Sequence, residues 1–115
     1  SFVDADLTGA ILREAEIVDS DLSGATLDGI DATGGVMEYV NMDDTSCTNC
    51  IFNGVEFEGD VGAEVTMRNI QCVNCNFIKA KLSHGILDHG NFIGAQMMEM
   101  PIHFSSLDHA DFSFG

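Results

Sequence analysis

Large apolar side chains recur at every fifth residue, from Phe2 near one end to Phe112 near the other. The 115 residues make 23 such blocks with no insertion between them, and only four blocks lack a large apolar residue at the repeating position. A small residue usually stands two positions before it. A period of five fits neither the 3.6-residue turn of a helix nor the two-residue alternation of a strand. The pattern therefore predicts a repeat architecture.

The blocks ADLTG, SDLSG, ATLDG and ADFSF resemble the A(D/N)LxG consensus of the pentapeptide-repeat family, and the resemblance covers the whole chain. It implies an all-β fold, a right-handed quadrilateral parallel β-helix (a solenoid) in which four blocks complete one coil. The large residue and the small residue two positions before it would point inward. Residues 1–115 are then expected to form a single domain of about 5.75 coils, with residues twenty apart stacked.

Two segments depart from the repeat. Asp60 and Gly62 occupy an inward pair that cannot build a core, and an unpaired inward carboxylate is costly. We therefore expect a bulge over residues 58–64. Met100 followed by Pro101 predicts a second irregularity, because proline lacks the N–H that a strand ladder needs.

Both ends of the chain lie within the repeat, and no capping segment interrupts it. Uncapped terminal coils would expose apolar interior and unpaired backbone. We therefore expect either that capping segments have been lost or are disordered, or that a partner protein or a second copy covers an open end.

The chain is strongly acidic, with 19 Asp and Glu against 4 Lys and Arg and a formal charge of −15. Four scattered cations cannot form the basic footprint of an ordinary nucleic-acid binder. In bacterial relatives that the chain resembles, an acidic rod imitates DNA and occupies DNA gyrase. The alternative, which we favour, is a solubilising surface. On the expected tube one acidic face contains Glu16, Asp19, Glu38, Glu56 and Glu58.

An apolar corner is expected in the second half of the chain. Val73 should stack on Ile93 and Ile78 on Met98, with Phe114 nearby. An outward apolar cluster of this kind marks a contact surface for a protein partner or a second copy, whereas single surface hydrophobes are common and carry no such meaning.

The cysteines form two C-x2-C pairs, Cys47 with Cys50 and Cys72 with Cys75. This spacing is typical of a zinc site. If residues twenty apart stack, however, the pairs lie on different corners, which argues against a metal. Each pair could form a disulfide in an oxidising compartment, or the thiols could serve as small apolar core residues, which we favour.

Catalytic motifs are missing from the sequence. There is no nucleophile elbow, phosphate loop or His-x3-His pair, so we expect no enzyme activity, no catalytic or cofactor-binding residue and no metal. His89 and His109 should stack, each beside an outward Asp. A metal on that ladder is conceivable, but exposed neutral histidines are commoner.

The sequence is therefore interpreted as a non-catalytic protein-interaction or scaffold module, a subunit of a larger complex such as a photosynthetic one. A DNA-mimicking inhibitor or protector of gyrase or topoisomerase is the alternative, and a secreted bacterial effector comes third. The thylakoid lumen or plastid and the bacterial cytoplasm both remain open as locations. No apolar run is long enough to span a membrane, so any membrane association would be peripheral to a membrane complex.

Overall fold

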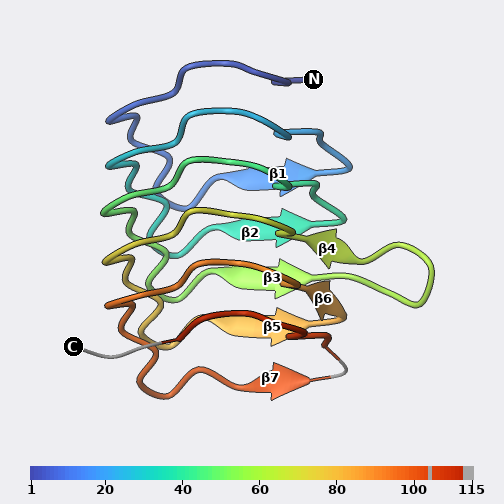
Figure 1. The fold of residues 1–115 in the computed structure, drawn as a ribbon. Coiled ribbons are helices and arrows are strands. Elements are labelled where there is room, and N and C mark those ends of the chain that lie inside the picture. Colours follow the sequence, from blue (N-terminus) through green and yellow to red (C-terminus); the bar gives the residue numbers. More distant parts are fainter. Residues whose placement is uncertain (104, 113–115) are drawn as a thin grey trace.

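A computed structural model describes residues 1–103 and 105–112, and within them the chain forms short strands and no helix. The strands are β1 (Glu16–Val18), β2 (Val36–Glu38), β3 (Glu56–Glu58), β4 (Val65–Thr66), β5 (Lys81–Ser83), β6 (Gly85–Ile86) and β7 (Ile102–His103). All strand pairs are parallel. One sheet runs β1-β2-β3-β5-β7, and β4 pairs with β6. The strands stack coil upon coil (Figure 1), which confirms the expected β-solenoid.

Single-residue bridges continue the stacking on the other sides of the tube. Thr26 pairs with Asp6 in the coil before it and with Ser46 in the coil after it, twenty residues away in each direction. The Leu7 N–H donates to the Thr26 carbonyl at 2.8 Å, and a turn follows in which the Ala10 N–H donates to the Leu7 carbonyl at 3.0 Å. Each block of five thus supplies one wall segment and one turn.

The turns require a left-handed backbone at one position. Gly24 (φ 71°) and Asn49 (φ 60°) occupy it, and both residue types adopt this conformation at low cost. This requirement explains why glycine, asparagine and aspartate recur there in the sequence.

The core is a column of apolar side chains inside the tube. Its largest members are four phenylalanines, each at most 1% exposed: Phe52, Phe57, Phe77 and Phe92. The rings of Phe52 and Phe77 stack with centroids 5.1 Å apart. Ile30 and Ala32 exchange the usual order of small and large residues, yet both are buried, because the volume of the pair is conserved.

Residues 60–64 lie outside the wall, which confirms the predicted bulge. Asp60 and Ala63 exchange backbone hydrogen bonds of 3.1 and 3.0 Å, and Val61 at the tip is 84% exposed. The two ends of the loop meet, since a Cβ on Gly59 would lie 2.8 Å from the Val65 nitrogen. Figure 1 shows the loop projecting between β3 and β4.

The loop changes the stacking register without changing the five-residue phase. Val36 pairs with Glu56, twenty residues on, but Glu56 pairs with Lys81, twenty-five residues on. The spacing returns to twenty where Gln71 pairs with Asn91. The expectation that residues twenty apart stack is therefore wrong across the loop, and 5.75 coils is an overestimate, because five residues add no wall.

The second irregularity, predicted at Met100 and Pro101, does not alter the register. Leu82 in β5 still pairs with Ile102 in β7, twenty residues on, and the Leu82 N–H donates to the Pro101 carbonyl at 3.1 Å. Proline lacks only the donor, and its carbonyl still accepts. The pairing of β5 with β7 is accordingly limited to two residues.

Candidate interaction surfaces and the cysteine cluster

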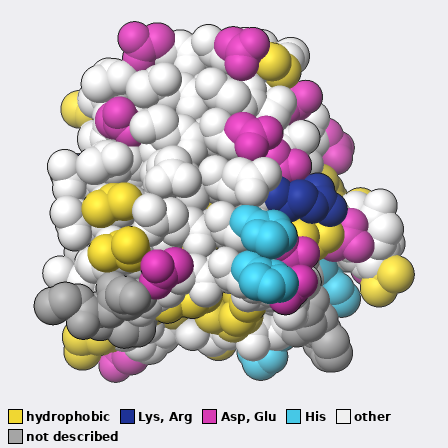
Figure 2. All heavy atoms as spheres, in the orientation of Figure 1, with side chains coloured by type: hydrophobic (Ala, Val, Ile, Leu, Met, Phe, Trp, Pro, Cys, Tyr) yellow, Lys and Arg dark blue, Asp and Glu magenta, His cyan; other side chains and the backbone are white. Residues whose placement is uncertain are grey.

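The acidic face lies on the sheet formed by β1, β2 and β3. Glu38 and Glu58 are direct partners in neighbouring strands, and Glu16 and Glu56 stand in the parallel column on the other side of the inward residue. Asp19 follows β1 in the turn. Figure 2 shows Asp and Glu side chains spread over the upper part of the view and His side chains lower down.

The acidic face ends at β5. Lys81 follows Glu56 in the same column, with its Nζ 3.9 Å from the Glu56 Oε1, and Ser83 follows Glu58. The structure therefore brings the predicted acidic residues together, and it limits the uncompensated charge to the first three strands.

Several of the other carboxylates accept hydrogen bonds within the turns of the tube. Asp31 Oδ1 accepts from the Thr33 hydroxyl at 2.6 Å and from the Thr33 N–H at 3.1 Å, and Asp31 Oδ2 lies 2.6 Å from the Arg13 Nε. These contacts, the hydroxyl first, lower the pKa of Asp31 to about 2. Hydrogen bonds from Thr8 likewise lower the pKa of Asp6. Asn41 makes the equivalent bond to a backbone N–H, so this position needs an oxygen acceptor and not a charge.

A second set of carboxylates joins successive coils, which sequence reasoning missed. Asp88 Oδ1 accepts from the Ser106 hydroxyl at 2.6 Å and from the Asp108 N–H at 2.9 Å. The Ser106 bond is the main cause of the lowered pKa of Asp88. Asp28 makes the same pair of bonds to Ser46 and Thr48. The signal that could have revealed them is a serine eighteen residues after an outward aspartate.

The four described residues of the apolar corner stack in the two pairs expected from the sequence. Val73 lies over Ile93 and Ile78 over Met98, because the N–H groups of the following residues, Asn74 and Lys79, donate to the carbonyls of Ile93 and Met98. Ile93 is 39% and Met98 68% exposed, while Val73 and Ile78 are half-buried. Phe114 lies outside the described residues.

A shallow depression of about 400 Å³ adjoins this corner and is lined by Ala95, Gln96, Met97 and Met98. The border toward the preceding coil is polar. There Thr48 lies over Val73 and Asn53 lies over Ile78, so the two apolar columns do not continue into that coil. The apolar corner is therefore bounded by polar side chains on the side of the preceding coil.

A larger cavity of about 520 Å³ opens at the first coil of the described structure. It is lined mainly by inward apolar side chains, among them Leu7, Leu12, Ile17 and Leu22. Phe2 beside it is 47% exposed. The lining of this cavity is therefore mainly apolar.

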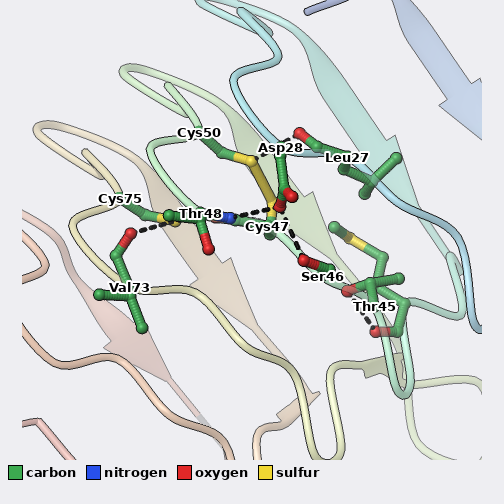
Figure 3. Close-up of a disulfide and its surroundings, with 10 residues drawn as sticks. Leu27, Asp28, Thr45, Ser46, Cys47, Thr48, Cys50, Val73 and Cys75 are labelled. Atoms are coloured by element: carbon green, nitrogen blue, oxygen red, sulfur yellow. Dashed lines mark hydrogen bonds between the residues drawn. A yellow bond between two sulfur atoms is a disulfide. The ribbon is translucent and has the colours of Figure 1, made fainter. Parts of the chain in front are cut away.

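The four cysteines form one buried cluster, and the expectation that the two pairs lie on different corners is wrong. The five loop residues shift the second pair by one block, so Ser46 pairs with Gln71 and Ile51 with Asn76. Cys47 is therefore stacked on Cys72 and Cys50 on Cys75. The structure has a disulfide between Cys47 and Cys50, shown in Figure 3, and free thiols at Cys72 and Cys75.

The histidine ladder is present in the structure. The rings of His89 and His109 are nearly parallel with centroids 5.0 Å apart, and the His109 Nδ1 lies 3.0 Å from the Asp108 Oδ1. Among the described residues, the one group of three or more His, Cys, Asp or Glu side chains close enough to share a metal is Cys47, Cys50 and Cys75. His89, His109 and their neighbouring aspartates do not form such a group.

Residues 1–38 match a family model described as pentapeptide repeats (8 copies), whereas no curated protein matches the sequence. Among solved structures, the fold is similar to HetL from Nostoc sp. strain PCC 7120, a pentapeptide repeat protein involved in heterocyst differentiation regulation. The TM-score is 0.51 at 14% identity, over 95% of this chain and 58% of HetL.

Two further structures show lower scores. Rfr23 from Cyanothece 51142 gives a TM-score of 0.43 at 10% identity, over 93% of this chain and 90% of Rfr23. A pentapeptide repeat protein from the Arabidopsis thaliana thylakoid lumen gives 0.44 at 16% identity, over 92% of this chain and 63% of that protein. This chain thus spans about three fifths of the length of HetL and of the Arabidopsis protein. The described residues contain no helix long and apolar enough to cross a membrane.

Proposed function

The chain is a pentapeptide-repeat protein, and from this premise we propose that it is a non-catalytic module that binds another protein through its apolar corner. The observation that supports the proposal is the patch of Val73, Ile78, Ile93 and Met98 beside the depression at Met97. Met98 is 68% exposed there. Flexible methionine side chains adapt to different partner shapes, and exposed apolar clusters are typical of contact surfaces.

The partner's chemistry follows from the surroundings of the corner. An apolar side chain of the partner would fill the depression, and the flanking pair of Lys79 and Glu99, 4.0 Å apart, would stay at the polar rim. The charge of the first three coils favours a partner with a basic surface, because complementary charge accelerates association.

We also propose that the module is not an enzyme. The inward positions of the tube are occupied by apolar side chains, and both cavities among the described residues have mainly apolar linings. Catalysis needs polar or titratable groups that converge on a substrate, and neither lining supplies such a set.

Capture from the native source tests the proposed surface. The double variant Ile93→Asp with Met98→Asp places two charges on exposed positions and is expected to keep the fold. It should lose the protein that the wild-type chain captures. Ile11→Asp is the matched control, since Ile11 is 77% exposed on another part of the surface. Equal capture of the same protein by the wild-type chain and the double variant would refute the proposal.

DNA mimicry is the second candidate, and the stacked Glu38 and Glu58 favour it, because like charges repeat at strand spacing there. In a gyrase supercoiling assay, mimicry predicts dose-dependent inhibition or protection that Glu38→Gln with Glu58→Gln weakens. Asp6→Asn with Asp21→Asn removes the same charge from turn positions and should have less effect. No response to the wild-type chain would exclude this candidate.

A further inference from the structure

The two C-x2-C pairs are brought into register by the loop of residues 60–64. Each pair flanks a turn, and the two turns belong to successive coils, directly above one another. The Cys47 N–H donates to the Gln71 carbonyl at 2.7 Å, which sets the first cysteine of one pair over the first cysteine of the other. A spacing that is typical of zinc sites in sequence is therefore matched by proximity in space.

The sulfur atoms lie close together in a dry environment. One ligand atom each of Cys47, Cys50 and Cys75 lies within 4.8 Å of the other two. Cys72 supplies the fourth sulfur, because the register of the two coils stacks it on Cys47, although this sulfur lies more than 4.8 Å from at least one of the other three. All four residues are at most 1% exposed. Figure 3 shows Cys75 beside the bonded pair.

We propose that the chain with all four cysteines reduced binds one Zn²⁺ ion through Cys47, Cys50, Cys72 and Cys75. Zinc prefers four thiolates in a tetrahedron with Zn–S distances of about 2.3 Å, which places the sulfur atoms about 3.8 Å apart. The sulfur atoms of Cys47, Cys50 and Cys75 already lie within 4.8 Å of one another, so those that are too far apart need to approach by at most about 1 Å. After reduction the Cys47 and Cys50 sulfurs move apart, and the Cys72 sulfur rotates toward the other three. The cysteines flank turns, where side chains have more freedom to rotate than in the interior of a strand.

Metal binding and the disulfide exclude each other, because both use the sulfur atoms of Cys47 and Cys50. A phosphine reductant supplies two electrons to the disulfide and becomes a phosphine oxide, while water supplies the oxygen and the two protons of the new thiols. Zn²⁺ then replaces four thiol protons and leaves a Zn(Cys)4 centre with a net charge of −2. The Cys75 thiol, which now donates to the Cys47 carbonyl at 2.6 Å, loses that proton to solvent.

The protonation of the cluster makes zinc binding depend on pH. Burial, together with the hydrogen bond and charge of Cys75, raises the pKa of the Cys72 thiol. Zinc coordinates thiolates, so each of the four cysteines has to lose its proton on binding and apparent affinity rises with pH.

The experiment loads the full chain during refolding, because the cluster is buried. The chain is reduced with a phosphine, unfolded in urea, refolded without oxygen in the presence of Zn²⁺ and freed of loose metal. We expect about one zinc per chain by elemental analysis, released by acid. Co²⁺ in place of zinc should give the visible bands of a tetrahedral site and a thiolate charge-transfer band.

Matched variants separate this cluster from other metal-binding side chains. Cys50→Ala with Cys75→Ala should fold, since Ala25 and Ala80 occupy the same small inward position in other turns, and it should lower bound zinc about tenfold or more. His89→Ala with His109→Ala should leave the zinc content unchanged. Zinc-loaded wild-type chain should also resist formation of the Cys47–Cys50 disulfide in air, as read by mass.

Three results would overturn the proposal. The reduced, refolded chain could hold no more zinc than the Cys50→Ala, Cys75→Ala variant. The histidine variant could lose the metal instead. The Co²⁺ form could show no thiolate charge-transfer band, which would place the metal on other ligands.

Discussion

Lengthening the loop at residues 60–64 should barely affect stability, because the loop lies outside the wall of the tube. The perturbation is the insertion of Gly-Ser-Gly between Val61 and Gly62. Val61 is 84% exposed and the loop ends already meet at Gly59 and Val65, so no core contact is lost. Extending a loop from five to eight residues costs about 0.4 kcal/mol of closure entropy, from (3/2)RT ln(8/5).

The matched control places the same three residues in a regular turn, between Asp28 and Gly29. There the insertion breaks the five-residue phase, and buried neighbours such as Leu27 and Ile30, each 1% exposed, would have to leave their positions. Removing the buried contacts of one Leu or Ile side chain lowers the free energy of unfolding by about 2–5 kcal/mol. Urea unfolding followed by circular dichroism measures both variants. The reasoning is refuted if the loop insertion lowers the free energy of unfolding as much as the turn insertion does.

Further outcomes follow from the same structure. Deleting residues 60–64 should leave a folded tube, because Gly59 then joins Val65 directly; loss of the cooperative unfolding transition would contradict this. Phe57→Ala should cost about 3–5 kcal/mol in urea unfolding, since Phe57 is fully buried against two other rings, and a cost under about 1 kcal/mol would show that the ring is not packed there. Asp31→Asn should lower the unfolding midpoint less than Asp31→Ala does, because Asn loses the charge but retains the oxygen acceptor; equal effects would show that the acceptor contributes nothing. Stability should be retained above pH 3.8 and fall as the pH drops toward about 2, because Asp31 and Asp88 have lower pKa values when folded than when unfolded; thermal melts that do not change over this range would contradict the assignment.

The five-residue period predicts a repeat architecture, and the β-solenoid fold came from the resemblance of the blocks to the pentapeptide-repeat consensus. The bulge was predictable because Asp60 and Gly62 cannot serve as an inward pair. The stacking within the acidic face and within the described part of the apolar corner follows the spacing of twenty, since each lies on one side of the loop.

The cysteine cluster could not be found from the period alone. A bulge of one complete block leaves the five-residue phase intact, so the sequence on either side looks continuous while the stacking partner changes from twenty to twenty-five residues away. The hydrogen bonds of Asp28 and Asp88 to the next coil depend on side-chain rotamers, which no spacing rule specifies.

The position of Cys47 relative to the following coil is the most direct test of this account, because the changed register assembles the cluster. Its N–H donates to the Gln71 carbonyl at 2.7 Å, and the Thr66 carbonyl accepts from Met42. Scalar coupling across hydrogen bonds, measured by NMR on labelled protein, identifies each donor and acceptor. We expect a coupling between the Cys47 nitrogen and the Gln71 carbonyl carbon. A coupling between Cys47 and Thr66 would mean an unbroken twenty-residue coil and would contradict it.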